Sequence, residues 1–284
     1  MDKPTGPSSH GVVSAARKAL GTRKVGHAGT LDPMATGLLV LGVGTATRLL
    51  TYLVGANKMY TATIRLGSAT VTDDAEGDTI STAAPETLAA VTDADIAREV
   101  AALTGEIDQR PSAVSAIKVD GQRAYDRVRA GDDVVLDARQ VTVSRFDVHD
   151  IRRVADFIDL DVSVDCTSGT YIRALARDMG AALGVGGHLT ALRRTRVGSL
   201  AVADACTPDD ITESRLLTPA AIAATLFPVW TTTVDEARDI GHGKKVTADV
   251  SDAPLVAAVH DGRLLAIVVA KNGVARVVTG FPHD

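Results

Sequence analysis

Aromatic residues and cysteines are scarce in this chain of 284 residues. Four Phe, four Tyr and one Trp make up 3% of it. Proteins that bind single-stranded nucleic acid by stacking many bases on aromatic side chains need more of them, so this binding mode is disfavoured. The two cysteines, Cys166 and Cys206, form neither a C-x-x-C pair nor a metal-ligand spacing. This argues against a disulfide framework and against a zinc site.

Long hydrophobic runs are also missing. No stretch of about 18 apolar residues occurs, and no charged segment followed by an apolar one begins the chain, so neither a membrane-spanning helix nor a signal peptide is predicted. With 45% hydrophobic and 23% charged residues, the composition is that of a folded protein with one large domain and a small one. We therefore expect a cytoplasmic protein.

An excess of positive charge is lacking as well. The formal net charge of −5 argues against a protein that coats nucleic acid without specificity. The charges are segregated, however: residues 1–60 carry seven Lys and Arg against two acids, residues 166–200 five Arg against one acid, and residues 72–108 ten acids against one Arg. Either these charges are scattered over solvated faces, or the two basic segments form one surface from which the acids are kept away.

The hydrophobic pattern predicts a mixture of helices and strands. Ser8 can cap a helix that continues to about residue 20, and residues 171–183 have the apolar spacing of a second helix. Residues 58–67 and 158–165 alternate as strands, the second with its acids directed outward. Helices and strands do not alternate as regular βαβ units, so an α+β fold is favoured over a doubly wound one.

The last part of the chain changes in character. A helical run ends at about Phe227, and three short apolar segments follow, at residues 255–260, 263–270 and 274–279. Asp-Gly and Asn-Gly dipeptides separate these segments, and both are well suited to tight hairpins. Residues 229–284 are therefore predicted to form a small all-β module. Because no low-complexity linker precedes it, we expect it to pack closely against the rest.

Residues 26–37, with the sequence G-H-A-G-T-L-D-P-M-A-T-G, are the densest candidate site. One interpretation is structural: Asp32 caps a helix that Pro33 begins. The other rests on three glycines, a histidine and two threonines within twelve residues, which indicate close approach of the backbone to a ligand. A carboxylate beside backbone donors stays ionised, which suits a nucleophile.

Several other catalytic patterns are absent from the sequence. It contains no G-x-x-x-x-G-K-[ST], so G-V-G-T at residues 42–45 is not a phosphate loop, and it contains no G-x-S-x-G and no pair of His at helical spacing. Taken singly, His27 is typical of a hydrogen-bonded structural histidine. Tyr60 and Tyr171 are typical of half-buried residues, and Arg173 of a surface arginine.

Six motifs follow one another between residue 1 and about residue 200. They are D-K-P-T-G-P-S-S at residues 2–9, the stretch at 26–37, K-M-Y at 58–60, a segment with Pro111, Ser112, Ser115, Ala116, Lys118, Gly121 and Tyr125, C-T-S-G-T-Y-I-R at 166–173, and L-R-R-T at 192–195. In this order they resemble the TruB family of tRNA pseudouridine synthases, which modify the uridine at position 55 in the T-loop.

The resemblance implies a role for each matching residue. Asp32 corresponds to the family's catalytic aspartate, the nucleophile at the target nucleoside, and Arg173 to the arginine that pairs with it. Tyr60 corresponds to the tyrosine that stacks on the uracil and is proposed to help remove the C5 proton. Positions that contact or shape the pocket for the flipped nucleotide are matched by His27, Tyr171 and Leu192. Lys3 and Pro4 fall in a supporting motif.

The resemblance also implies a reaction and a partner. The enzyme would break the N-glycosidic bond, rotate the base and re-attach it through C5, with no cofactor and no metal. Asp32 would attack either C1′ of the ribose or C6 of the base. The partner would be the T-stem-loop of tRNA, bound by a monomer. The alternative is a protein that only remodels tRNA, but the joint presence of Asp32, Tyr60 and Arg173 favours catalysis.

The implied fold is an α+β pseudouridine synthase core with a mixed, mostly antiparallel sheet over residues 1–228. Within it, about residues 105–131 would form a thumb-like segment that grips the RNA. Residues 229–284 would form a PUA-like β domain, or a packing module without RNA contact. Family members usually have an apolar strand before the D-K-P motif, whereas Met1 precedes it directly here. We therefore expect one edge of the core sheet to be unpaired.

Overall fold

A mixed sheet forms the centre of the computed structural model, which describes residues 1–113, 118–119, 122–123 and 136–282. Within these residues the strand order is β1-β3-β13-β5-β12-β11-β8, with β14 beside β13. Among the described strands of this sheet, only β3 and β13 pair in parallel, which confirms the mixed, mostly antiparallel sheet and the α+β fold. The bounds are β1 (Asp2–Lys3), β3 (Thr36–Leu38), β5 (Lys58–Leu66), β8 (Gly105–Gln109), β11 (Arg139–Val154), β12 (Phe157–Cys166), β13 (Gly187–Val197) and β14 (Leu200–Ala201).

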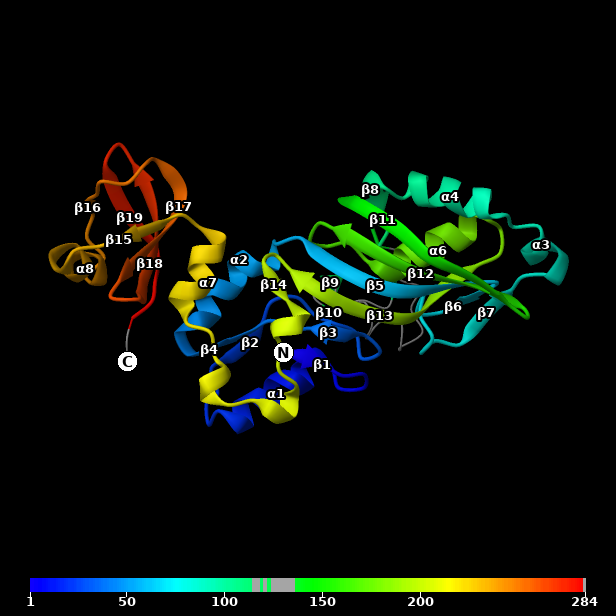
Figure 1. Cartoon of the computed structure of the whole chain (residues 1–284), viewed down its shortest axis with the longest axis horizontal. Coiled ribbons are helices and arrows are strands. Elements are labelled where there is room, and N and C mark those ends of the chain that lie inside the picture. The colour runs from blue at the N-terminus through cyan, green and yellow to red at the C-terminus, as the bar shows by residue number, and fades with distance from the viewer. Residues whose placement is uncertain (114–117, 120–121, 124–135, 283–284) are drawn as a thin grey trace.

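The main core lies on one face of this sheet, where α6 (Ile172–Ala182) and α4 (Asp93–Ala102) cover it (Figure 1). Alternate residues of β5 and β12 point into it, as their period of two requires. Leu175 and Met179 of α6 are fully buried against them. The predicted helix and both predicted strands are therefore confirmed. So is the first helix, α1 (Ser9–Ala19), since the Ser8 side chain accepts a hydrogen bond from the Gly11 backbone at 3.1 Å.

The acids of β12 do lie on the face of the sheet opposite the core, but they are not simply directed into water. β12 is an interior strand, so its neighbours supply partners. Arg65 of β5 donates two hydrogen bonds of 2.7 Å to Asp159, which is only 8% exposed. Arg196 of β13, the next strand beyond β5, reaches across β5 and contacts Asp165 at 2.5 Å. Cross-strand ion pairs therefore cover this face.

The hypothesis of a basic surface kept away from acids is wrong for residues 166–200. Arg193 pairs with Asp2 at 2.7 Å, and Arg177 pairs with Asp73, which belongs to the acidic segment, at 3.2 Å. Arg194 is buried, with 1% exposure. The fold thus brings acids from distant parts of the chain to these arginines, which segment sums do not reveal.

The end of the chain forms a second sheet in the order β15-β17-β18-β19-β16. Both predicted hairpins are present, and their Asp261-Gly262 and Asn272-Gly273 turns have positive φ throughout. A helix that was not predicted from the sequence, α8 (Val234–Gly241), also packs on this sheet. Its capping box of Thr233 and Glu236 is a local sequence signal for a helix start. The bounds are β15 (Val229–Thr231), β16 (Val246–Thr247), β17 (Ala253–His260), β18 (Arg263–Lys271) and β19 (Val274–Gly280).

The second sheet is held to the rest by α7 (Pro219–Leu226), α2 (Leu50–Val54) and η1 (Gly44–Leu49), which lie between the two sheets in Figure 1. A buried apolar cluster joins them and includes Leu49, Ala223 and Ile267. The hydroxyl groups of Tyr52 and Thr279 lie 2.8 Å apart across the same contact. The close packing expected from the absence of a linker is therefore present.

Shorter elements surround the main sheet. They are β2 (Val25–His27), β4 (Leu41–Val43), β6 (Ser68–Thr70), β7 (Thr79–Thr82), β9 (Lys118–Val119), β10 (Gln122–Arg123), α3 (Pro85–Ala89), η2 (Val202–Asp204), η3 (Pro208–Asp210) and η4 (Glu213–Arg215). Ser115, Ala116, Gly121 and Tyr125 of the thumb-like segment lie outside the described residues. Among the described helices, none has the length and apolar character needed to cross a membrane. The edge beside β3 is occupied by the two residues of β1.

Candidate active site

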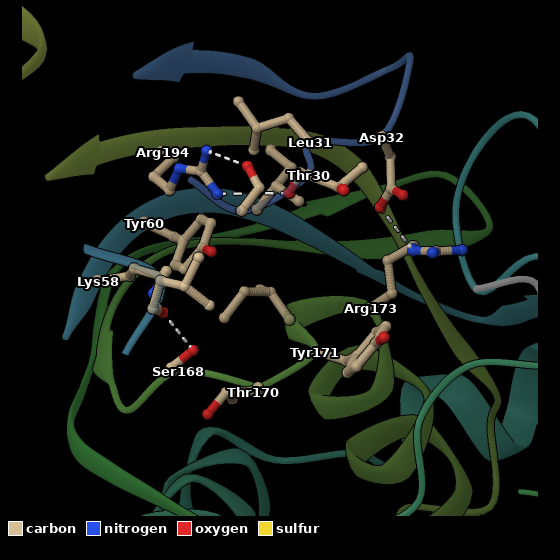
Figure 2. Close-up of a pocket in the computed structure, with 15 residues that line it drawn as sticks. Thr30, Leu31, Asp32, Lys58, Tyr60, Ser168, Thr170, Tyr171, Arg173 and Arg194 are labelled. Carbon is tan, nitrogen blue, oxygen red and sulfur yellow. Dashed lines mark hydrogen bonds and ion pairs between the residues drawn. The ribbon is translucent and has the colours of Figure 1, made fainter. Parts of the chain in front are cut away.

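A pocket of about 240 Å³ opens where the residue 29–32 loop meets β5, β13 and the start of α6. Figure 2 shows Asp32 and Arg173 facing each other on one side of it, and Lys58, Tyr60 and Arg194 on the other. Its lining residues are Gly29, Thr30, Leu31, Asp32, Val54, Lys58, Tyr60, Ser168, Gly169, Thr170, Tyr171, Ile172, Arg173, Leu192 and Arg194. Three of the sequence motifs, at residues 58–60, 166–173 and 192–195, therefore meet the motif that contains Asp32 at this pocket.

Asp32 lies in the loop between β2 and β3, and no helix begins at Pro33. The interpretation of Asp32 as a helix cap is therefore wrong. The backbone is instead pinned on both sides of Asp32. The buried Ser9 hydroxyl accepts from the Leu31 N–H at 2.8 Å and donates to its carbonyl at 2.9 Å, while the buried Lys3 ammonium donates to the Pro33 carbonyl at 3.1 Å.

Arg194 pins the same loop from the sheet. Its guanidinium donates to the carbonyls of Gly29 at 3.0 Å and Leu38 at 2.7 Å. These hydrogen bonds require β3 to lie directly beside β13, and Gly37 permits that close approach. Gly37 has φ +97, and a Cβ there would lie 2.2 Å from the Arg194 carbonyl oxygen, so no other residue fits.

The Arg173 guanidinium connects two carboxylates. Its Nε lies 3.1 Å from Oδ2 of Asp32, and its Nη1 lies 3.4 Å from Oδ2 of Asp74, while Nη1 also donates to the Thr72 carbonyl at 2.6 Å. Burial raises the pKa of Asp32 above its usual range; Arg173 opposes this shift, whereas Asp74 adds to it. Pairing with Arg173 therefore limits the rise of this pKa but does not reverse it. The sequence-based expectation that neighbouring donors keep the carboxylate ionised does not allow for this effect of burial.

Tyr60 and Arg194 are direct partners in the ladder between β5 and β13. Burial raises the pKa of the Tyr60 phenol, and the Arg194 charge opposes that effect. The Tyr60 hydroxyl is therefore neutral near pH 7, and its ring is available as an apolar surface in the pocket.

Lys58 is a buried ammonium in the same wall. It donates to the carbonyls of Val54 at 2.9 Å and Ala56 at 2.6 Å. Burial, with help from the Arg194 charge, lowers the pKa of Lys58 to about 8. The Ser168 hydroxyl donates to the same Val54 carbonyl at 2.7 Å, which ties the loop before α6 to α2.

The structure brings together five of the six residues predicted for the site, namely Asp32, Tyr60, Tyr171, Arg173 and Leu192. His27 is half-buried on β2 and does not line the pocket; burial lowers its pKa. Pro111 and Ser112 of the thumb-like segment are buried. Among the described residues, no three His, Cys, Asp or Glu side chains lie close enough to bind a metal ion.

Three residues at this site were missed by sequence reasoning. Lys58 and Arg194 stand inside two of the six motifs, so their position in K-M-Y and L-R-R-T was an available signal. No sequence signal distinguished Asp74, because it is one acid among ten in its segment. It contacts Arg173 only because the folded chain brings the two distant segments together. The arrangement as a whole presents a carboxylate, a guanidinium and an aromatic ring to one small ligand.

Comparison with known proteins identifies the family. A family model described as "TruB family pseudouridylate synthase (N terminal domain)" matches residues 17–172, and one described as "tRNA pseudouridylate synthase B C-terminal domain" matches residues 173–229. The tRNA pseudouridine synthase B of Leifsonia xyli subsp. xyli is 55% identical over 289 residues, covering 100% of this chain and 96% of the relative. That of Corynebacterium diphtheriae is 52% identical over 271 residues, covering 94% and 90%.

Solved structures show the same fold. A chain of a crystallised Cbf5-Nop10-Gar1 complex superposes with a TM-score of 0.71 at 27% identity, covering 99% of this chain and 83% of that one. A chain of an H/ACA RNP bound to a substrate RNA containing 2′-deoxyuridine has a TM-score of 0.71 at 25% identity, covering 99% and 84%.

Proposed function

Because this chain belongs to the TruB family of pseudouridine synthases, which are isomerases, we propose that it converts the uridine at position 55 of the tRNA T-loop to pseudouridine. The observation that carries the proposal is the contact of 3.1 Å between Arg173 and Asp32 at the wall of a pocket that also holds Tyr60. The relatives are named tRNA pseudouridine synthase B, which supports tRNA as the substrate.

The reaction proposed here is an isomerisation, so atoms and electrons balance without a co-reactant. The N1–C1′ bond of the target uridine breaks, the base turns, and a C5–C1′ bond forms, while the C5 proton is lost and N1 gains one. We assign the nucleophile to Asp32, whose side chain is 36% exposed toward the pocket. Its carboxylate would bond either to C1′, as the N1–C1′ bond breaks, or to C6 of the base, and this bond would break again by the time the C5–C1′ product is complete, so that Asp32 is regenerated. Arg173 orients this carboxylate and opposes its protonation.

The target nucleotide lies in a folded loop, so it has to leave its stack to reach Asp32, which costs on the order of a few kcal/mol. The Tyr60 ring can offset this cost, because stacking of a base on an aromatic ring contributes about 1–3 kcal/mol. The raised pKa of Tyr60 keeps the phenol neutral, which suits stacking better than proton removal. Tyr171 and Leu192 complete the wall around the base, and His27 acts from outside the pocket.

We further propose a division of the chain into a catalytic domain, residues 1–228, with a thumb-like segment at about residues 105–131, and a PUA-like domain, residues 229–284. The protein would act as a monomer in the cytoplasm on the T-stem-loop. The contact through Leu49, Ile267 and Phe281 supports a fixed spacing between the second sheet and the pocket.

The experiment is to incubate the protein with an unmodified tRNA transcript and to map pseudouridine by carbodiimide adducts and primer extension. We expect one new stop in the T-loop, at position 55. A transcript with cytidine at that position is the matched control and should give no stop. Absence of the stop, together with faster tRNA folding in its presence, would instead support a protein that remodels tRNA without modifying it.

A further inference from the structure

The last residue of β8, Gln109, is a buried polar side chain that makes two hydrogen bonds to one backbone unit. It is 2% exposed. Its Nε2 donates to the Tyr171 carbonyl at 3.0 Å, and its Oε1 accepts from the Tyr171 N–H at 2.8 Å. The side-chain amide thus contacts both polar groups of the Tyr171 backbone. It gives the N–H its acceptor and adds a third donor to the carbonyl, which also accepts from the N–H groups of Ala174 at 3.1 Å and Leu175 at 3.3 Å in the first turn of α6.

Tyr171 is the point at which the pocket and α6 meet. It is the N-cap residue of α6 with an extended backbone, and its side chain makes no capping hydrogen bond. Its side chain lines the pocket, and Arg173 follows two residues later in the first turn of the helix. The orientation of the Tyr171 backbone therefore sets both the direction of its ring and the approach of Arg173 to Asp32.

A second contact ties the same strand end to the same helix. Nη2 of Arg177, one turn beyond Arg173, donates to the Arg110 carbonyl at 2.7 Å. Nη1 of Arg177 lies 3.2 Å from Asp73, the neighbour of Asp74. The end of β8 and the residue 72–74 loop are thus both fastened to the first two turns of α6, around the arginine that faces Asp32.

We propose that Gln109 is a positioning residue for the isomerisation, which holds the Tyr171 backbone so that the Tyr171 ring and the Arg173 guanidinium keep their places at the target uridine. This inference rests on the proposed function. Gln109 does not line the pocket, so it acts through Tyr171 and not on the substrate. Its loss should slow the chemical step, because small displacements of catalytic groups reduce rates strongly.

The test compares single-turnover rates of pseudouridine formation with the dissociation constant for tRNA. Gln109→Leu removes both hydrogen bonds at nearly constant volume, and the rate should fall by about 10²-fold while tRNA binding changes little. Gln140→Leu is the matched control: it is the same substitution on the adjacent strand β11, at an exposed position, and should leave the rate unchanged.

Gln109→Glu gives a second readout, taken only at pH values at which circular dichroism shows the variant to be as fully folded as wild type. An ionised Glu can accept from the Tyr171 N–H but cannot donate to its carbonyl, whereas a protonated Glu can do both. Burial raises the pKa of such a carboxyl, so the rate of Gln109→Glu relative to wild type should rise from about pH 8 to about pH 6.

The outcomes separate this inference from the function on which it rests. A wild-type protein without turnover would contradict the proposed function and this inference with it. An active wild type whose Gln109→Leu variant matches Gln140→Leu would overturn the positioning role alone. A variant that loses only tRNA binding, or a Gln109→Glu ratio that does not change with pH, would overturn it too.

Discussion

Nε of Arg173 lies 3.1 Å from Oδ2 of Asp32, and the two side chains differ sharply in exposure, at 4% for the arginine and 36% for the aspartate. The cation is therefore fixed inside the protein while the carboxylate faces the pocket. Asp74, at 3.4 Å, balances the buried charge from the other side. Asp32 is thus held by a rigid partner and remains open to a ligand, as a nucleophile requires.

Arg173→Gln should shift the acidic limb of the pH–rate profile to higher pH and lower the plateau by about 10²-fold. The sign follows from the present balance: burial already raises the pKa of Asp32 and Arg173 opposes it, so removal of the cation raises that pKa further. Single-turnover rates across the acidic range provide the measurement. Arg193→Gln is the control, because Arg193 pairs with Asp2 away from the pocket. If the acidic limb of the pH–rate profile stayed in place in Arg173→Gln, the role of Arg173 as partner of Asp32 would be refuted.

Lys58 should make the stability of the protein increase with pH in the alkaline range. Its pKa is about 8 in the folded protein and 10.5 in the reference state, so the unfolded chain binds more protons between these values. As the pH rises above the pKa of Lys58 in the folded protein, the buried ammonium loses its proton and the cost of burying its charge disappears, so the free energy of unfolding increases. From about pH 7 to about pH 9.5, wild type should gain about 2 kcal/mol relative to Lys58→Met. Urea unfolding at both pH values tests this, and parallel curves would contradict it.

Gly37→Ala should destabilise the folded protein more than Gly105→Ala does. Gly37 and Gly105 have nearly the same φ, +97 and +98, but only Gly37 lies against the Arg194 backbone, while a Cβ on Gly105 meets nothing within 4 Å. The backbone strain is therefore matched, and the difference measures the close approach of β3 to β13. We expect Gly37→Ala to lose about 2 kcal/mol more than Gly105→Ala in chemical denaturation. Equal losses would show that β3 can move away without cost.

Local signals in the sequence predicted much of the fold. The Ser8 cap, the alternation of β5 and β12 and the two Gly-containing hairpins each depend on residues close together in the chain, so pattern alone was sufficient. The motifs likewise predicted five of the residues that line the pocket, because each of these residues occupies a defined position within its motif.

Long-range partners could not be predicted in this way. Asp159 was expected on a solvated face, yet Arg65 of the adjacent strand covers it. Asp74 was one acid in an acidic run, yet it reaches Arg173 across about a hundred residues of chain. Neither the order of the strands nor the burial of a given acid follows from local periodicity, since both depend on which segments become neighbours.

The most direct test of the central claim is Asp32→Asn assayed on an unmodified tRNA transcript, with the variant's mass checked to exclude deamidation. We expect no pseudouridine at position 55 and tRNA binding like that of wild type. We also expect no loss of folding stability near pH 7. Burial raises the pKa of Asp32, so the ionised carboxylate is less favourable in the folded chain than in the unfolded one, and its replacement by a neutral amide removes that cost. Measurable turnover by Asp32→Asn would contradict the assignment of Asp32 as the nucleophile.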